Sequence, residues 1–137
     1  MNQQDQRSET DFFGEVVYSY TRKQAVEDGC QVLLTGDHAA LARDFGWKYP
    51  IYFTRGVWGL IEQSAAFEND PNDLTGILWD FFLNARFGKD VTEDIRKFYV
   101  TINKDGRRQR HLFYIQVGPT DIDDPAPALT IMQEEDR

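Results

Sequence analysis

Cysteine is almost absent from this sequence, in which Cys30 is the only one. A single thiol excludes an intramolecular disulfide, and its place between Gly29 and an apolar run indicates a small buried side chain rather than a nucleophile. A chain of 137 residues can bury enough surface to fold without a disulfide or a metal. We therefore expect a protein of a reducing compartment, the cytoplasm.

Long hydrophobic runs are also missing. No run approaches the roughly 20 apolar residues that a membrane span requires, and the first residues lack the apolar centre of a signal peptide. We expect no membrane partner. Residues 1–11 are polar and rich in Gln, which predicts a disordered tail before a single domain over 12–133, and residues 134–137 form an acidic tail.

The sequence lacks the common catalytic signatures. It has no Gly-rich phosphate loop, no His-Glu-x-x-His and no Gly-x-Ser-x-Gly, and its two histidines, His38 and His111, are far apart in the chain. The acidic run Asp121-Ile122-Asp123-Asp124 lacks the spacing of a calcium loop. We therefore predict no metal, no cofactor and no enzymatic activity.

Positive charge is missing from two long segments, residues 56–85 and 118–136, and the net charge is −8. A net negative charge disfavours binding to the phosphate backbone of nucleic acid and favours binding to a basic partner. Aligned carboxylates can imitate a phosphate track and occupy the basic groove of a nucleic-acid-handling protein. The acids predicted to contact such a partner are Glu62, Glu68, Asp70, Asp73, Asp121, Asp123 and Asp124.

Basic residues crowd one segment, 104–111. Direct binding of nucleic acid through this segment is an alternative, because cationic side chains bind phosphates and nearby aromatic rings stack on bases. The overall negative charge makes it less favoured than a protein partner. The candidate contacts are Lys104, Arg107, Arg108 and Arg110.

Two Thr-Arg pairs, Thr21-Arg22 and Thr54-Arg55, allow a third interpretation. An enzyme or a small-anion-binding domain could use both arginines if the fold brings them to one pocket, because a guanidinium binds an anion in a bidentate manner. The residues of this predicted anion pocket are Tyr18, Tyr20, Arg22 and Arg55. Both threonines are also explained as helix caps.

Local patterns predict helices and strands along the whole chain. We expect strands over 12–20 and 30–34, an extended segment over 48–53, and four helices that begin after Thr21, Asp37, Thr54 and Asp73. Gly29, Gly46 and Gly88 should end three of these helices. The fold class is α+β, with an antiparallel sheet of about 3–4 strands covered on one face by about 3–4 helices.

The C-terminal third predicts an antiparallel hairpin. Residues 97–103 and 109–117 alternate between apolar and polar, and Asp105-Gly106 is a favoured two-residue turn. This register places Phe98 opposite Phe113 and Ile102 opposite Gln109. We expect a loop over 118–127 and a further strand over 128–132.

Several motifs resemble a small uncharacterised bacterial domain family of plasmids, phages and other mobile elements. The resemblance spans about residues 12–132. It rests on Phe13-Gly14-x-Val16-Val17-Tyr18-Ser19-Tyr20-Thr21-Arg22-x-Gln24-Ala25-Val26-Glu27-Asp28-Gly29, Lys48-Tyr49-Pro50, Thr54-Arg55-x-Val57-Trp58, Gly76-x-Leu78-Trp79-Asp80, Gly118-Pro119 and Leu129-Thr130-Ile131-Met132.

This resemblance implies a genetic neighbourhood and no catalytic residue. Small acidic accessory proteins of mobile elements include inhibitors of host defence. Together with the acidic segments, it leads to the hypothesis of a non-enzymatic protein-binding inhibitor that blocks a CRISPR or restriction complex by occupying its nucleic-acid-binding groove.

Overall fold

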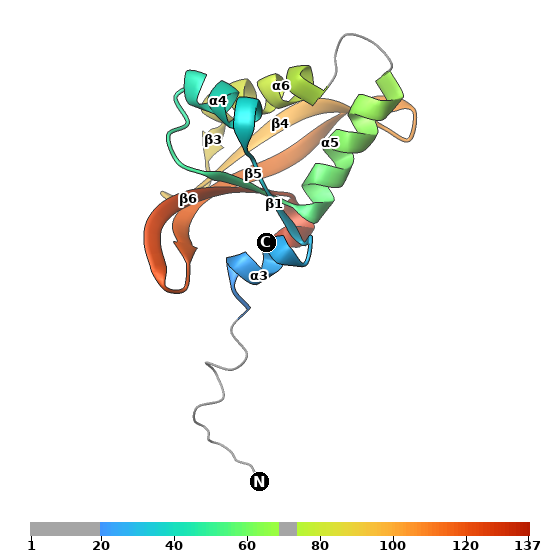
Figure 1. The fold of residues 1–137 in the computed structure, drawn as a ribbon. Helices are drawn as coiled ribbons and strands as arrows, with labels where there is room; N and C mark the ends of the chain where they lie inside the picture. The colour runs from blue at the N-terminus through green and yellow to red at the C-terminus, as the bar shows by residue number, and fades with distance from the viewer. Residues whose placement is uncertain (1–19, 69–73) are drawn as a thin grey trace.

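The computed structural model of the chain describes residues 20–68 and 74–137. In Figure 1 the helices Gly36–Asp44 and Leu74–Arg86 lie above a curved sheet, and the short helix Arg22–Glu27 lies below it. The predicted tail over 1–11 and nearly all of the predicted strand over 12–20 lie outside the described residues. The elements are α3 (Arg22–Glu27), β1 (Gln31–Leu33), α4 (Gly36–Asp44), β2 (Ile51–Thr54), α5 (Arg55–Glu68), α6 (Leu74–Arg86), β3 (Lys89–Asp90), β4 (Ile95–Lys104), β5 (Arg107–Asp121), β6 (Asp124–Met132) and the 3-10 turn η1 (Glu134–Asp136).

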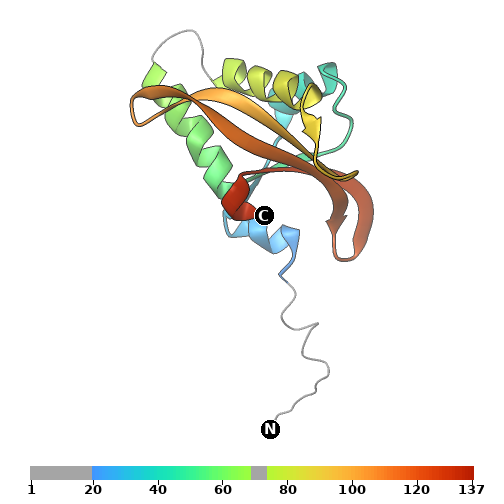
Figure 2. The same ribbon diagram turned by 180° about the vertical axis from the view of Figure 1, so that it is seen from behind.

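The strands form one six-stranded sheet in the order β1-β2-β6-β5-β4-β3 (Figure 2). β2 runs parallel to β6, and every other neighbouring pair is antiparallel. The α+β class is confirmed, but the prediction of about 3–4 antiparallel strands is wrong in number and in the sense of one pair. The sequence does not predict β3, because two residues are too few to show alternation. It does not predict the parallel pair either, because β6 is far from β2 in the chain.

The β4–β5 hairpin has the predicted register. Phe98 lies opposite Phe113, Ile102 opposite Gln109 and Lys104 opposite Arg107. Asp105 and Gly106 form the turn, and both have positive φ values of 55° and 79°. A two-residue turn of this type matches the twist of the strands, which is why local sequence was sufficient here.

The end of β5 and the start of β6 differ from the prediction of a loop over 118–127. β5 continues to Asp121 and β6 begins at Asp124, so that these residues form a second hairpin. Pro119 lies opposite Pro127 in this pairing. The φ of proline is compatible with an extended strand where no ladder hydrogen bond from its nitrogen is needed.

Helix starts follow the predicted capping residues in two cases. Thr21 caps α3 in a capping box with Gln24, and the Thr54 hydroxyl accepts from the Val57 N–H at 3.4 Å. α4 instead has Thr35 at its N-cap, and Asp37 lies in the first turn, where a carboxylate favours the positive end of the helix dipole. The predicted cap of α6, Asp73, lies outside the described residues.

Two further expectations need correction. Cys30 is exposed rather than buried. The helices do not all cover one face, because α3 contacts the opposite face of the sheet through Arg22, which reaches Gln31 and Thr130. Among residues 20–68 and 74–137, none of the helices combines the length and the apolar character of a membrane span.

The core lies between the sheet and the pair α5 and α6. Phe81 of α6 is fully buried, and its ring centroid is 6.4 Å from that of Phe53, 6.0 Å from that of Phe98 and 4.7 Å from that of Phe113. These three rings belong to β2, β4 and β5. One side chain therefore connects three strands to the helical layer.

Replacing Phe81 with Ala should lower the free energy of unfolding by about 3–5 kcal/mol, because a buried ring is lost and a cavity remains. Phe87→Ala is the matched control, since Phe87 is 76% exposed just beyond the same helix. Its effect should stay within about 0.5 kcal/mol. Urea denaturation of both variants makes the comparison, and equal losses would contradict this account of the core.

Gly88 is the point where the backbone leaves α6 and passes close to β4. A Cβ at Gly88 would lie 2.4 Å from the carbonyl oxygen of Lys97, whereas one at Gly59 in α5 would meet nothing within 4 Å. We expect Gly88→Ala to destabilise the fold by about 1–3 kcal/mol through overpacking. Gly59→Ala should stabilise it by about 0.5–1 kcal/mol through helix propensity. Thermal unfolding should move the melting temperatures in opposite directions.

Candidate functional site

A cavity of about 460 Å3 lies where α3 meets the second hairpin and the open face of the sheet. We call it the α3 cavity. Its walls carry four carboxylates and two cations, and among the described residues that line it none is His or Cys. The lining residues are Arg22, Lys23, Val26, Glu27, Leu33, Tyr52, Thr120, Asp121, Asp123 and Asp124.

Arg22 forms one wall of this cavity, and its Nε and Nη1 groups donate hydrogen bonds within the chain. Its Nε donates to the carbonyl of Thr120 at 2.7 Å, and its Nη1 donates to Gln31 and to Thr130, each at 3.0 Å. The guanidinium carbon lies 4.1 Å from the ring centroid of Tyr52. Burial lowers the pKa of Arg22. This arginine therefore joins α3 to the sheet.

Asp121 binds the first turn of α3. Its two carboxylate oxygens accept from the backbone N–H groups of Arg22 at 3.1 Å and Lys23 at 3.0 Å. The Ile122 N–H, followed by that of Lys23, lowers the pKa of Asp121. A carboxylate is favourable here because the first N–H groups of a helix have no intrahelical partner. This acid, predicted to contact a partner, has a structural contact within the chain.

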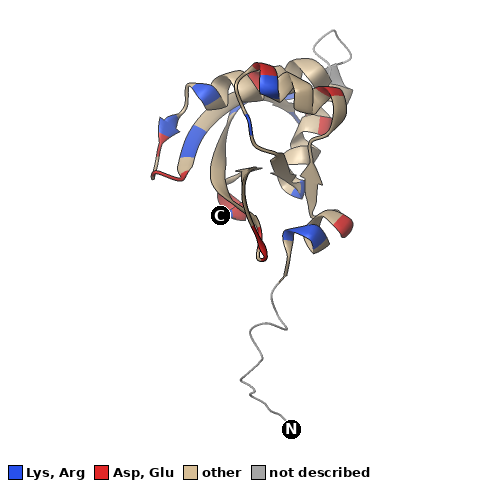
Figure 3. Cartoon of the chain, turned by 60° about the vertical axis from the view of Figure 1, so that its left-hand side comes forward, with Lys and Arg blue, Asp and Glu red and all other residues tan. Residues whose placement is uncertain are grey.

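The turn between β5 and β6, residues Asp121–Asp124, is called the hairpin tip here. Ile122 is 66% exposed there, which makes it one of the most exposed large apolar side chains of the described chain. Asp123 and Asp124 follow it and are exposed. Acidic residues colour the end of this hairpin in Figure 3. The tip therefore presents an apolar side chain among carboxylates.

The structure separates the predicted acidic residues into two groups. Glu62 is exposed on α5, and α5 ends at Glu68, while Asp70 and Asp73 lie outside the described residues. The end of α5 and the hairpin tip lie at opposite ends of the molecule in both Figure 1 and Figure 2. The described acids therefore lie on two separate elements, α5 and the hairpin tip.

The basic residues of segment 104–111 lie on the β4–β5 hairpin. Arg107, Arg108 and Arg110 are exposed, and Lys104 is half-buried. The guanidinium carbon of Arg110 lies 3.9 Å from the ring centroid of Tyr99. Arg108 interacts electrostatically with Asp80. Burial raises the pKa of Asp80, and the positive charge of Arg108 acts to lower it. The four bases therefore have different surroundings.

The predicted anion pocket does not assemble around both arginines. Arg22 lines the α3 cavity, but Arg55 does not. The backbone N–H of Arg55 donates to the carbonyl of Cys30 at 2.9 Å, and its side chain is exposed. The Tyr20 hydroxyl donates to Asp28 at 2.8 Å, and this bond raises the pKa of Tyr20. Tyr18 lies outside the described residues.

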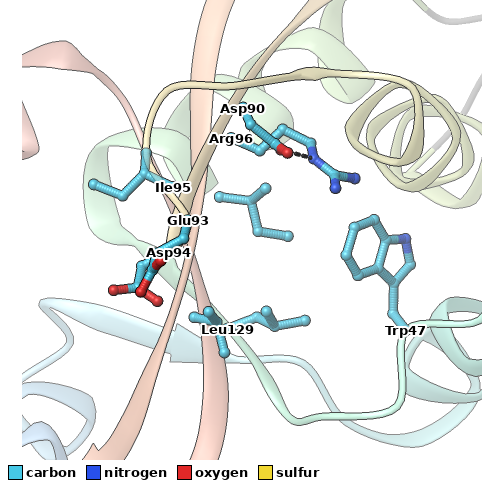
Figure 4. A pocket seen from close by; sticks show the side chains of 9 residues that line it. Trp47, Asp90, Glu93, Asp94, Ile95, Arg96 and Leu129 are labelled. Carbon is cyan, nitrogen blue, oxygen red and sulfur yellow. Dashed lines mark hydrogen bonds and ion pairs between the residues drawn. The ribbon is translucent and has the colours of Figure 1, made fainter.

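A second, smaller cavity of about 140 Å3 opens beside Trp47 (Figure 4). Arg96 crosses it and donates from Nε to Asp90 at 2.9 Å, and from Nη1 to the carbonyls of Ala85 and Arg86, each at 3.2 Å. These carbonyls belong to the last turn of α6, where no intrahelical donor is available. The cavity is therefore closed at one side by a helix-capping arginine and has little room for a ligand.

The C-terminal segment, predicted as an acidic tail, forms η1 and packs against β5. The Tyr114 hydroxyl donates to Glu134, which raises the pKa of Tyr114. The Arg137 guanidinium carbon lies 4.4 Å from the Tyr114 ring centroid. These contacts cover part of the open face of the sheet.

Comparison of the chain with protein-family models, with curated proteins and with solved structures found no match. Within the part of the chain that the structure describes, no group of three or more His, Cys, Asp or Glu side chains is placed to hold a metal ion. The interpretation of function therefore depends on the surfaces themselves.

Sequence reasoning missed Ile122 because it expected a loop over 118–127. Without a hairpin, an isolated Ile among acids has no particular position. The signal was present in the paired strand residues, since Val117 lies opposite Leu129 and Gly118 opposite Ala128. Extending this register outward centres the turn on Asp123, and the register shift between Pro119 and Asp121 moves it by half a residue, to Ile122 and Asp123.

Replacing Asp121 with Asn should destabilise the fold at neutral pH, because the amide retains one acceptor oxygen for two helix N–H groups. The pKa of Asp121 is lowered by folding, so its contribution is present above the unfolded-state pKa and is lost as pH falls through the folded-state value. The difference in melting temperature from the wild type should therefore shrink from pH 7 towards acid. Asp123→Asn, a substitution at an exposed position of the same turn, is the control and should leave the melting temperature at pH 7 close to that of the wild type.

Proposed function

We propose that the chain is a non-enzymatic protein-binding module that occupies a basic, nucleic-acid-binding groove of a partner protein. The observation that supports this most is the hairpin tip, in which the exposed Ile122 stands between Asp121 and Asp123. An apolar side chain in an acidic surround is complementary to an apolar pocket with a basic rim.

Energetic considerations favour such a contact. Burying an Ile side chain is worth about 1.5–3 kcal/mol, which is a large share of the binding energy of a small interface. The carboxylates add orientation and a faster encounter with a basic partner rather than most of the affinity. The net charge of −8 acts in the same direction over a longer range.

The resemblance to plasmid and phage domains supports a more specific proposal, an inhibitor of a CRISPR or restriction complex. In this proposal the tip of the second hairpin enters the groove that normally holds a phosphate backbone. Glu62 lies on α5, a different element from the hairpin tip, and is tested separately.

The proposed contact predicts that the double variant Ile122→Ser/Asp123→Lys loses its partner. Tagged wild-type protein should capture a stoichiometric protein from nuclease-treated host lysate, and the double variant should capture at least about tenfold less, since both the apolar anchor and a charge are lost. Val91→Ser/Glu93→Lys is the matched control, because Val91 and Glu93 are exposed in the loop between β3 and β4. It should capture the partner like the wild type.

Two results would contradict the proposal. One is equal capture by the hairpin variant and the wild type, with melting temperatures showing that both are folded. The other is loss of every partner after nuclease treatment, which would mean that nucleic acid held them. Glu62→Lys forms a separate arm, and partner loss confined to it would move the contact from the hairpin tip to α5.

A further inference from the structure

Another cavity of about 460 Å3 lies at the β3 edge of the sheet, where α6 ends and β3 begins. We call it the β3–β4 cavity. Its lining includes three cations and no acid, in a protein whose net charge is −8. The lining residues are Asn84, Phe87, Gly88, Lys89, Lys97, Phe98, Tyr99 and Arg110.

Two of the cations repel each other across the strands. Lys89 of β3 lies directly opposite Lys97 of β4. Like charges at opposite positions destabilise a sheet, so an anion bound between them would remove a cost of the folded state. The neighbouring Asp90 does not neutralise them, because it is paired with Arg96 at 2.9 Å. Basic residues on β3 and the adjoining part of β4 appear in blue in Figure 3.

Aromatic rings accompany these cations. The Tyr99 ring is partly exposed and has the Arg110 guanidinium carbon 3.9 Å from its centroid. Phe87 is 76% exposed. Exposed rings beside a guanidinium are surfaces on which unpaired bases stack. The carboxylate side chains of an acidic peptide have no flat rings that could stack on them.

We propose that the β3–β4 cavity binds single-stranded nucleic acid. Lys89, Lys97 and Arg110 contact phosphates, and bases stack on Tyr99 and Phe87. A duplex fits less well, because its bases are paired and stacked on one another and cannot reach the rings. This site is distinct from the hairpin tip and does not depend on the function proposed for it.

The net negative charge does not exclude such binding. The Debye length is about 8 Å at physiological ionic strength, so acids elsewhere on the surface are screened while the cations that touch a phosphate are not. The site differs from the basic segment 104–111 considered from the sequence, because only Arg110 of that segment lines the cavity.

The test is fluorescence anisotropy of a labelled, mixed-sequence single-stranded DNA of about ten nucleotides, titrated with the full chain at several salt concentrations. We expect binding that weakens as the salt concentration rises. The slope of the logarithm of the association constant against the logarithm of the salt concentration should be about −2, because each of three neutralised phosphates contributes about −0.7. The same sequence as a duplex should bind more weakly.

Variants locate the site. Arg110→Ala and Lys97→Gln should each weaken binding and make the salt slope shallower by about 0.7. Tyr99→Ala should weaken binding about tenfold with little change in slope, because it removes stacking and no charge. Arg107→Ala is the matched control, since Arg107 is also an exposed arginine of β5 but lies outside the cavity, and it should bind like the wild type.

Lys89→Gln serves as a second variant if Arg110→Ala unfolds, because Lys89 is exposed on a short edge strand. Absence of binding at low salt overturns the proposal. So does an equal loss with Arg107→Ala, which would place the contact at the β4–β5 turn, or tighter binding of polyglutamate than of DNA, which would indicate an acidic peptide. If the Ile122→Ser/Asp123→Lys variant binds the single-stranded DNA as tightly as the wild type does, this would support two independent surfaces.

Discussion

The packing of Phe81 against three strands is the contact on which the rest of the structure depends. Phe53 comes from β2, whereas Phe98 and Phe113 face each other in the later β4–β5 hairpin. The ring of Phe81 packs against all three. Because α5 and α6 bury one face of the sheet in this way, both proposed surfaces lie outside this core. The hairpin tip is the turn between the central strands β5 and β6, and the β3–β4 cavity lies at the β3 edge of the sheet.

A second constraint joins the two ends of the described chain. Asp121 accepts hydrogen bonds from the first N–H groups of α3, and the Arg22 side chain of α3 donates hydrogen bonds to Thr120 and Thr130. These bonds hold the second hairpin against α3. The tip beyond them, with Ile122 exposed, is therefore presented from a fixed base rather than from a free loop.

The charge of the protein is better understood by location than by its total. The carboxylates of the hairpin tip line the α3 cavity and the three cations line the β3–β4 cavity, so each surface can have its own partner. At physiological salt, charges separated by more than about 8 Å act nearly independently. An acidic protein can therefore contain a basic site.

The Thr21 cap, the helix spacing of α5 and α6, and the Asp105-Gly106 hairpin with its register could be read from the sequence, because each depends on residues close in the chain. The β2–β6 pairing, the second hairpin, the lining of the α3 cavity by Arg22 without Arg55, and the position of Lys89 opposite Lys97 could be read only from the folded chain. These depend on which distant segments pack together, and burial against a shared core selects that, not local propensity.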